Sequence, residues 1–295
     1  MRSLLFVGCM LVYGLCAGQG NIEDHYKIYD TRSKELISIE KIIDACNKAD
    51  VLFFGEEHND SVGHFLENKI FTLLHQRYGG HLALSLEMFE TDNQLVLDEY
   101  LAGTITEDRL SKDARLWSNY KDYRPMIEYA RKNKIPVIAA DPPRRYVSLV
   151  TRRGMRSLDS LSSSSKKFLP PLPYDTATGR YYEKFTALMS NGGGGPTSGS
   201  ANIYYSQNLW DAGMSYSIYS FWKKHKDKKV FHCVGRFHSD EKLGTLAQLQ
   251  KRKSRLSILN ISCFSDASFE NPDWNKFSNL GDFIIVTDPS VPKSY

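Results

Sequence analysis

Six short apolar runs, each followed by a loop and then a helix-like segment, constrain the fold of this chain more than any other sequence feature. Runs that are apolar on both faces are typical of strands buried in a parallel sheet, and the segments between these runs leave room for crossover helices. The sequence therefore predicts an α/β fold with a mostly parallel central sheet and helices on both faces. The predicted strands cover residues 51–54, 82–86, 136–140, 230–234, 256–261 and 283–286.

Three of the intervening helices have clear sequence signals. Asp60 or Ser61 can cap a helix that ends near Gly79. A second helix is predicted to start near Pro125 and to end before the third strand. A third is predicted from about residue 204 to residue 225, where apolar residues recur at helical spacing.

The segment at about residues 155–202 breaks this alternation with a serine run, a proline-rich stretch and four consecutive glycines. We interpret it as a helical or loop-rich insertion. The glycine run lacks the Lys and Ser/Thr that complete a phosphate-binding loop, so a flexible loop tip is the simpler interpretation. Four aromatic residues give the insertion apolar surface, and we expect it to fold over the sheet edge as a lid. They are Tyr174, Tyr181, Tyr182 and Phe185.

Residues 1–18 are typical of an export signal, because Arg2 is the only charge before an apolar run that is too short to span a membrane of about 20 apolar residues. Cleavage before Gln19 and lipidation at Cys16 both fit the sequence. We therefore expect one α/β domain over residues 19–295, located in the periplasm or held in the cell envelope as a lipoprotein. A lipid anchor would be its one contact with a membrane.

The bulk composition excludes two classes of protein. A formal net charge of +4 on 295 residues is too mild for a dedicated nucleic-acid surface, so no nucleic-acid partner is expected. Cys46, Cys233 and Cys263 remain after the leader, and an odd, scattered set does not form a disulfide framework. Cys233 and Cys263 fall within predicted strands, where buried packing is expected.

Acidic and imidazole groups follow four of the predicted strands. Ligands of an open parallel sheet bind beyond the carboxyl ends of its strands, so these groups are predicted to share one crevice. Each alone has a simpler explanation, because an acidic residue often caps the next helix and a lone histidine is more often structural. The set is Gly55-Glu56-Glu57-His58, Glu87, Asp141 and Gly235-Arg236-Phe237-His238. The two glycines would let the backbone approach a ligand closely.

Trp117, Tyr120 and Tyr123 form a second constellation at three-residue spacing. Such rings usually serve packing, but a phenolate oxygen suits ferric iron and flat rings suit a flat macrocycle. Gln207 and Asp211 lie on one face of the third predicted helix. They either orient a histidine or arginine of the crevice or face solvent, and the sequence leaves both open.

Taken in order along the chain, these motifs resemble the ChaN-like haem-binding family, which belongs to a wider group with TIKI-type metalloproteases and erythromycin-esterase-like hydrolases. The resemblance implies an α/β fold, an exported envelope protein, and haem held through a tyrosine, in some cases between the two subunits of a homodimer. The family tends to have Asn where this chain has Asp141, which would make the crevice more negative. The matching stretches are residues 55–60, 86–89, 117–125, 136–144, 207–214 and 235–238.

The leading hypothesis is therefore an exported haem-binding protein for haem and iron uptake. Tyr123 or Tyr120 would ligate the haem iron, with His58 or His238 as a second cofactor-binding residue. An outer-membrane haem receptor is the partner that such a role implies.

The alternative hypothesis is a hydrolase, either an esterase or a peptidase. His58, Glu87 and His238 would bind a divalent metal such as zinc or activate water directly. Glu56 would be the general base, and Arg144 or Arg236 would stabilise developing negative charge.

Overall fold

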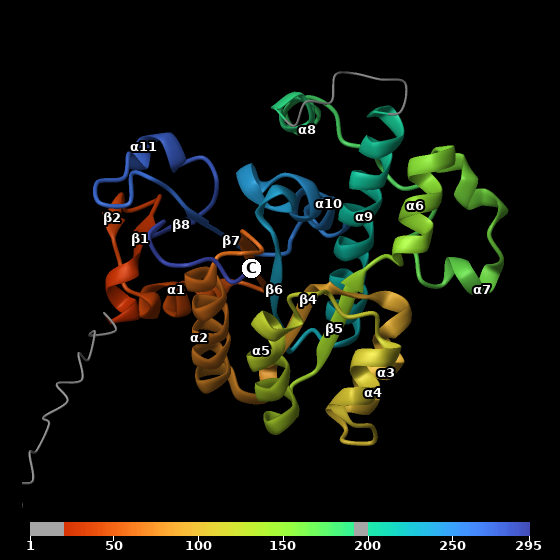
Figure 1. Ribbon diagram of the computed structural model, residues 1–295, viewed down its shortest axis with the longest axis horizontal. Helices are drawn as coiled ribbons and strands as arrows, with labels where there is room; N and C mark the ends of the chain where they lie inside the picture. The colour runs from red at the N-terminus through yellow and green to blue at the C-terminus, as the bar shows by residue number, and fades with distance from the viewer. Residues whose placement is uncertain (1–20, 192–199) are drawn as a thin grey trace, which may run out of the picture.

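The computed structural model describes residues 21–191 and 200–295. Its centre is a single sheet in the order β2-β1-β8-β7-β3-β6-β4-β5 (Figure 1). All neighbouring strands are parallel except β1, which pairs antiparallel with both β2 and β8. The strands are β1 Tyr26–Asp30, β2 Glu35–Leu36, β3 Val51–Glu56, β4 Leu82–Glu90, β5 Val137–Asp141, β6 Lys229–Gly235, β7 Ile258–Ser265 and β8 Phe283–Thr287.

The predicted fold class is confirmed, and each of the six predicted strands is present. Strands β3 to β8 correspond to them with small shifts at the ends. The antiparallel pair β1 and β2 was not predicted. The helices are α1 Ile39–Ala45, α2 Ser61–Tyr78, α3 Gln94–Leu101, α4 Glu107–Asp113, α5 Tyr120–Asn133, α6 Arg144–Arg153, α7 Ser163–Lys166, α8 Arg180–Asn191, α9 Ser200–Lys224, α10 Gly244–Arg252 and α11 Trp274–Phe277.

Helices cover both faces of the sheet, as Figure 1 shows for α2 and α5 on one side and α9 and α10 on the other. The alternation of side chains along β3 explains the two layers. Leu52 and Phe54 pack toward α1, α2 and α5, whereas Val51 and Phe53 pack toward α9 and α10. A strand that is buried on both faces must be apolar throughout, which is why the runs were recognisable in the sequence.

Helix α2 begins where the sequence predicted, because the Asp60 side chain accepts hydrogen bonds from the backbone N–H groups of Val62 and Gly63 at 3.0 and 3.1 Å. Helix α5 differs from the prediction. It begins at Tyr120, so Pro125 lies inside the helix and not at its start. The side chain of Asn119, the residue before the helix, donates to the backbone carbonyl of His58 at 3.2 Å. A tertiary contact thus fixes this end of the helix.

The insertion packs against the rest of the domain. Tyr174 is buried against α6 and α9, while Tyr181 and Phe185 are buried against Tyr204 and Phe237. Tyr182 remains 49% exposed. This places the insertion over the second Gly-x-x-His motif, and its action as a lid stays a prediction. The glycine run at residues 192–195 and the leader at residues 1–18 lie outside the described residues.

Cys46, Cys233 and Cys263 are buried and form no disulfide among the described residues, in agreement with the packing role expected for the last two. Across residues 21–191 and 200–295, none of the helices combines the length and the apolar character that a membrane crossing requires.

Candidate functional site

The two Gly-x-x-His motifs lie side by side because β3 and β6 are neighbouring parallel strands. Their register pairs Gly55 with Val234 and Glu56 with Gly235, so both motifs leave the sheet at the same level. Strand β4 lies next to β6 and brings Glu87 to the same edge. The predicted convergence of these groups is therefore observed.

The backbone of Gly235 lies close to both His58 and Glu87 and forms the floor of the crevice. A Cβ atom at Gly235 would lie 2.8 Å from Nε2 of His58 and 3.5 Å from a carboxylate oxygen of Glu87. The Gly235 N–H donates to the same oxygen of Glu87 at 2.6 Å. Any other residue would push His58 aside, which explains why the close approach requires glycine at this position.

Glu56 orients His58. Its Oε1 atom lies 2.8 Å from His58 Nδ1 and accepts a hydrogen bond from the Tyr123 hydroxyl at 2.7 Å. The Glu56 side chain is 1% exposed, whereas that of His58 is 33% exposed. Burial lowers the pKa of His58, but the hydrogen bond to Glu56 and the charges of Glu87 and Glu56 outweigh this and raise it to about 9.

Asp211 orients His238 in the same way as Glu56 orients His58. Its Oδ1 atom lies 2.7 Å from His238 Nδ1 and accepts from the Thr245 hydroxyl at 2.9 Å. The Tyr181 hydroxyl donates to the other oxygen of Asp211 at 2.6 Å. Burial lowers the pKa of His238, and the Asp211 carboxylate outweighs this and raises it. Of the two roles left open for Asp211, the orienting one is observed.

Gln207 and Glu87 complete the surroundings of His238. The Gln207 amide nitrogen lies 3.2 Å from His238 Nδ1 and 3.3 Å from the Tyr181 hydroxyl. A carboxylate oxygen of Glu87 lies 3.7 Å from His238 Nε2, so Glu87 stands between the two histidines. Sequence reasoning missed Tyr181 and Thr245 as members of the site, because neither belongs to a motif.

Trp117 and Arg144 form the rim of the crevice. The ring of Trp117 meets that of His58 edge to face at 5.1 Å, and the guanidinium of Arg144 lies 5.1 Å over the same indole. Arg144 is exposed at the start of α6. The Trp117 ring thus lies against His58 and carries the Arg144 cation, an arrangement that suits a flat ligand with an anionic group.

The two candidate tyrosine ligands are enclosed. Tyr123 is 0% exposed and its hydroxyl donates to Glu56. The Tyr120 hydroxyl is also buried, and its ring packs edge to face on Phe89 at 6.4 Å. Burial raises the pKa of both phenols, which opposes the phenolate form that iron binds. Ligation of haem iron by Tyr120 or Tyr123 would thus require the phenol to leave these surroundings.

The predicted metal ligands His58, Glu87 and His238 lie in the same crevice, but their ligating atoms are not all close enough to bind one metal ion. Within the two described stretches of chain, the one group of three His, Cys, Asp or Glu residues whose ligating atoms all lie within 4.8 Å of one another is Glu56, His64 and Glu67. His58, Glu87 and His238 are spread more widely around Gly235. The sequence signal for His64 and Glu67 was their three-residue spacing, which places both on one face of α2.

Asp141 is 2% exposed, and its Oδ1 atom is buried without a hydrogen-bond partner in the part of the chain that the structure describes. Burial and the charges of Glu87 and Glu90 raise its pKa well above the usual range. The neutral carboxyl is therefore favoured, which opposes the expectation that Asp141 makes the crevice more negative than Asn would.

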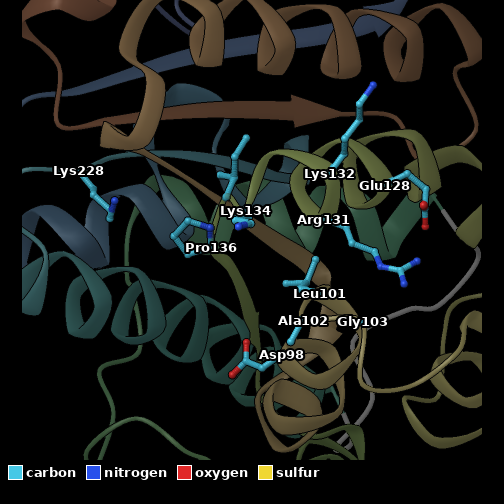
Figure 2. A pocket seen from close by; sticks show the side chains of 11 residues that line it. Asp98, Leu101, Ala102, Gly103, Glu128, Arg131, Lys132, Lys134, Pro136 and Lys228 are labelled. Carbon is cyan, nitrogen blue, oxygen red and sulfur yellow. The ribbon is translucent and has the colours of Figure 1, made fainter.

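A hollow of about 850 Å³ lies away from these residues. Figure 2 shows that Pro136, Gly103 and Lys228 are among its lining residues. Pro136 directly precedes β5, whereas Asp141 is at the carboxyl end of that strand. The hollow thus belongs to the edge of the sheet opposite the histidines, and it contains none of the predicted site residues.

Comparison with one solved structure supports the same fold. ChaN of Campylobacter jejuni, described as binding haem cofacially, is 19% identical with a TM-score of 0.68 over 90% of this chain and 97% of that chain. An erythromycin esterase in its open conformation is 12% identical with a TM-score of 0.47 over 90% of this chain and 83% of that chain.

Among curated proteins, the chloroplastic Protein RETICULATA-RELATED 5 of Arabidopsis thaliana is 29% identical over 92 residues. That match covers 30% of this chain and 12% of the plant protein. A family model described as haem-binding uptake, Tiki superfamily, ChaN matches residues 42–249, which include both Gly-x-x-His motifs, Glu87, Asp141 and Asp211. The chain therefore belongs to the ChaN haem-binding uptake family of the Tiki superfamily.

Proposed function

We propose that this protein binds haem in the crevice beside Trp117, with Nε2 of His58 as the iron ligand and Arg144 paired with a propionate. Family membership supports haem as the cofactor. The observation that carries the proposal is the 2.8 Å hydrogen bond from His58 Nδ1 to Glu56, which leaves Nε2 without a hydrogen bond among the described residues. A carboxylate on the far nitrogen of an imidazole fixes its orientation and increases its basicity as a ligand.

His58 is favoured over a tyrosine as ligand because it is accessible. One third of its side chain is exposed, whereas the Tyr123 and Tyr120 hydroxyls are enclosed. His238 is a weaker candidate, since its ring is only 9% exposed and contacts Asp211 and Glu87. Ligation of the iron by a tyrosine is therefore the alternative that an experiment must distinguish from ligation by His58.

Titration with hemin tests this assignment. We expect a shifted Soret band in the wild-type protein and in the Tyr120→Phe/Tyr123→Phe double variant, and loss of that band in His58→Ala. His81→Ala is the matched control, since His81 is 68% exposed and far from the crevice. Loss of the band in the tyrosine double variant with retention in His58→Ala would assign the iron to a tyrosine. No band in the wild type would remove haem binding altogether.

We further propose that the protein acts in haem and iron uptake after export to the cell envelope. The leader-like residues 1–18 support this location. Fractionation of cells that express the full chain, with mass spectrometry of the mature N-terminus, distinguishes a soluble periplasmic form from a lipid-modified Cys16. Recovery of uncleaved protein in the cytoplasm would contradict export.

A homodimer is proposed for the haem-loaded state, because cofacial haem binding is described for ChaN of Campylobacter jejuni. Light scattering coupled to size exclusion, with and without hemin, measures this directly. Extraction of hemin from the loaded protein by a purified outer-membrane haem receptor, or delivery from receptor to protein, would identify the exchange partner.

A hydrolase is the second candidate, and one observation favours it. The crevice holds two carboxylate–imidazole pairs, Glu56–His58 and Asp211–His238, and such pairs are typical of general-base catalysis. Arg144 at the rim can stabilise negative charge. Ester and peptide hydrolysis that is lost in His238→Ala, while hemin binding remains, would establish this activity.

A further inference from the structure

A buried cluster of Glu56, His64 and Glu67 lies beneath the crevice. Glu56 comes from the end of β3, while His64 and Glu67 are one helical turn apart on the face of α2 that packs against the sheet. Their side chains are 1%, 6% and 0% exposed. Two carboxylates and an imidazole thus share a space that water does not reach.

The hydrogen bonds of His64 define its tautomer. Nε2 lies 3.0 Å from the backbone carbonyl oxygen of His58, and a carbonyl can only accept, so Nε2 carries a proton. In the neutral ring, Nδ1 then carries a lone pair and no proton. It faces Glu67 Oε2 at 3.0 Å and Glu56 Oε2 at 3.3 Å. Three electron-pair donors therefore point at one another, and a cation must lie among them.

That cation is either a proton, held on Nδ1 or on a carboxyl oxygen, or a metal ion. A proton on Nδ1 would leave the cluster with incomplete hydrogen bonding, since Glu56 Oε2 and Glu67 Oε1 are both buried without a hydrogen-bond partner among the described residues. Buried carboxylate oxygens without partners are strongly unfavourable. A divalent ion would balance both carboxylates and use oxygen atoms that otherwise bond to nothing.

The spacing and the outer contacts both suit a metal. The three ligating atoms lie within 4.8 Å of one another, and tetrahedral zinc with bonds of about 2.1 Å places its ligands about 3.4 Å apart. A metal-bound histidine usually donates its other N–H to a carbonyl or carboxylate, as His64 does to His58. The opposite oxygen of Glu56 remains free to orient His58, so the cluster and the crevice are separate sites that share one residue.

We propose that Glu56, His64 and Glu67 form a buried binding site for a divalent first-row metal ion of the zinc class, distinct from the His58, Glu87 and His238 crevice. Two carboxylates and one imidazole are a donor set that zinc accepts. The ion would fix the start of α2 to the end of β3, and metal binding would contribute to folding stability.

The wild-type protein tests this without any variant. The full chain, purified without chelators and with its affinity tag removed, should contain about one equivalent of metal by mass spectrometry. After removal of that metal, titration with Co²⁺ should give visible absorption stronger than that of aqueous Co²⁺, and Zn²⁺ should raise the Tm. Protein that is free of metal as isolated, gives no cobalt band and keeps its Tm in Zn²⁺ would overturn the proposal.

Matched glutamine variants locate the ion. Glu67→Gln keeps the side-chain shape and should weaken metal binding roughly tenfold or more, while Glu87→Gln, a change of the same kind in the crevice, should retain the full equivalent. Metal lost in Glu87→Gln and retained in Glu67→Gln would assign the ion to the crevice and overturn the proposal. Should Glu67→Gln fail to fold, His64→Gln replaces it, and the cobalt spectrum of the wild type still decides.

Discussion

The Nδ1 atom of His58 lies 2.8 Å from Oε1 of Glu56, and this contact connects the accessible crevice with the buried cluster beneath it. The other oxygen of Glu56 faces His64. One carboxylate thus orients the histidine at the surface and balances charge in the interior. A substitution of Glu56 should therefore affect both the His58 crevice and the buried cluster.

The first prediction concerns the pH dependence of haem binding. His58 must lose its Nε2 proton to ligate iron, and its pKa is raised to about 9. Hemin affinity should therefore rise about tenfold per pH unit from neutral pH and level off near pH 9. In Glu56→Gln the plateau should begin at lower pH, because the carboxylate that holds the proton is gone.

Absorption titrations with hemin at a series of pH values measure both curves. At pH values on the plateau His58 is neutral in both proteins. There Glu56→Gln should bind hemin about 10–100-fold more weakly than the wild type, because the His58 ring is no longer oriented. Affinity that does not change with pH in the wild type would exclude His58 as the ligand.

The second prediction concerns Gly235→Ala. The added Cβ would lie 2.8 Å from His58 Nε2, so the ring must move, and we expect a loss of about 1–3 kcal/mol in the free energy of unfolding. Hemin binding should weaken with it. Gly80→Ala is the matched control, since a Cβ at Gly80 meets nothing within 4 Å. Urea denaturation and hemin titration of both variants measure the difference. Equal losses of stability and of hemin affinity in the two variants would contradict the close approach of His58 to Gly235.

The sheet and the edge that carries the site could be predicted because one physical fact determines both. Strands buried on two faces must be apolar throughout, and the polar residue that follows each run marks its carboxyl end. Strand β1, Tyr26–Asp30, was not predicted because it includes Lys27 and lies near the edge of the sheet, beside the short strand β2. A half-buried strand next to the sheet edge needs no continuous apolar run.

The inner part of the site could not be predicted, since its partners are distant in sequence. Tyr123 was selected for its chemistry as an iron ligand, but its hydroxyl donates to Glu56, 67 residues away. His64 has the sequence context of an ordinary polar residue in an amphipathic helix. Only the packing of α2 on β3 and on the Tyr123 ring, 5.0 Å from His64, makes it a buried group.

The third prediction concerns alkaline stability of the metal-free protein. Burial lowers the pKa of His64, but its hydrogen bond to Glu67 and the nearby carboxylates raise it to about 10, against 6.5 in an unfolded chain. A raised histidine pKa contributes stability that is complete below about pH 6.5 and is lost as the pH rises through about 10. The free energy of unfolding should fall across this interval.

Urea denaturation at several pH values measures this fall. It should be smaller in Glu67→Gln, because the neutral amide no longer holds the proton on His64. Ser61→Ala on the same helix serves as the control and should keep the wild-type pH profile, since the Ser61 hydroxyl bonds only to the Pro292 carbonyl among the described residues. A flat profile in the wild type would contradict the charged pair.

The last prediction concerns Asp141→Asn. The Asp141 pKa is raised by burial and by Glu87 and Glu90, so below about pH 3.8 both folded and unfolded chains are protonated and the carboxyl contributes nothing. Above that pH the unfolded chain ionises first, and stability falls until the folded pKa is passed. Asn lacks this proton, so the variant should gain on the wild type as the pH rises from about 4 toward neutrality.

Asp288→Asn provides a control of opposite sign. Its hydrogen bond to His25 lowers the pKa of Asp288, so its carboxylate stabilises the fold above the unfolded value, and removing the charge should cost stability as the pH rises. Denaturation curves at pH values from acid to neutral compare the two variants. If Asp141→Asn and Asp288→Asn changed stability in the same direction, the neutral state assigned to Asp141 would be wrong, and the crevice would carry the extra negative charge that its sequence first indicated.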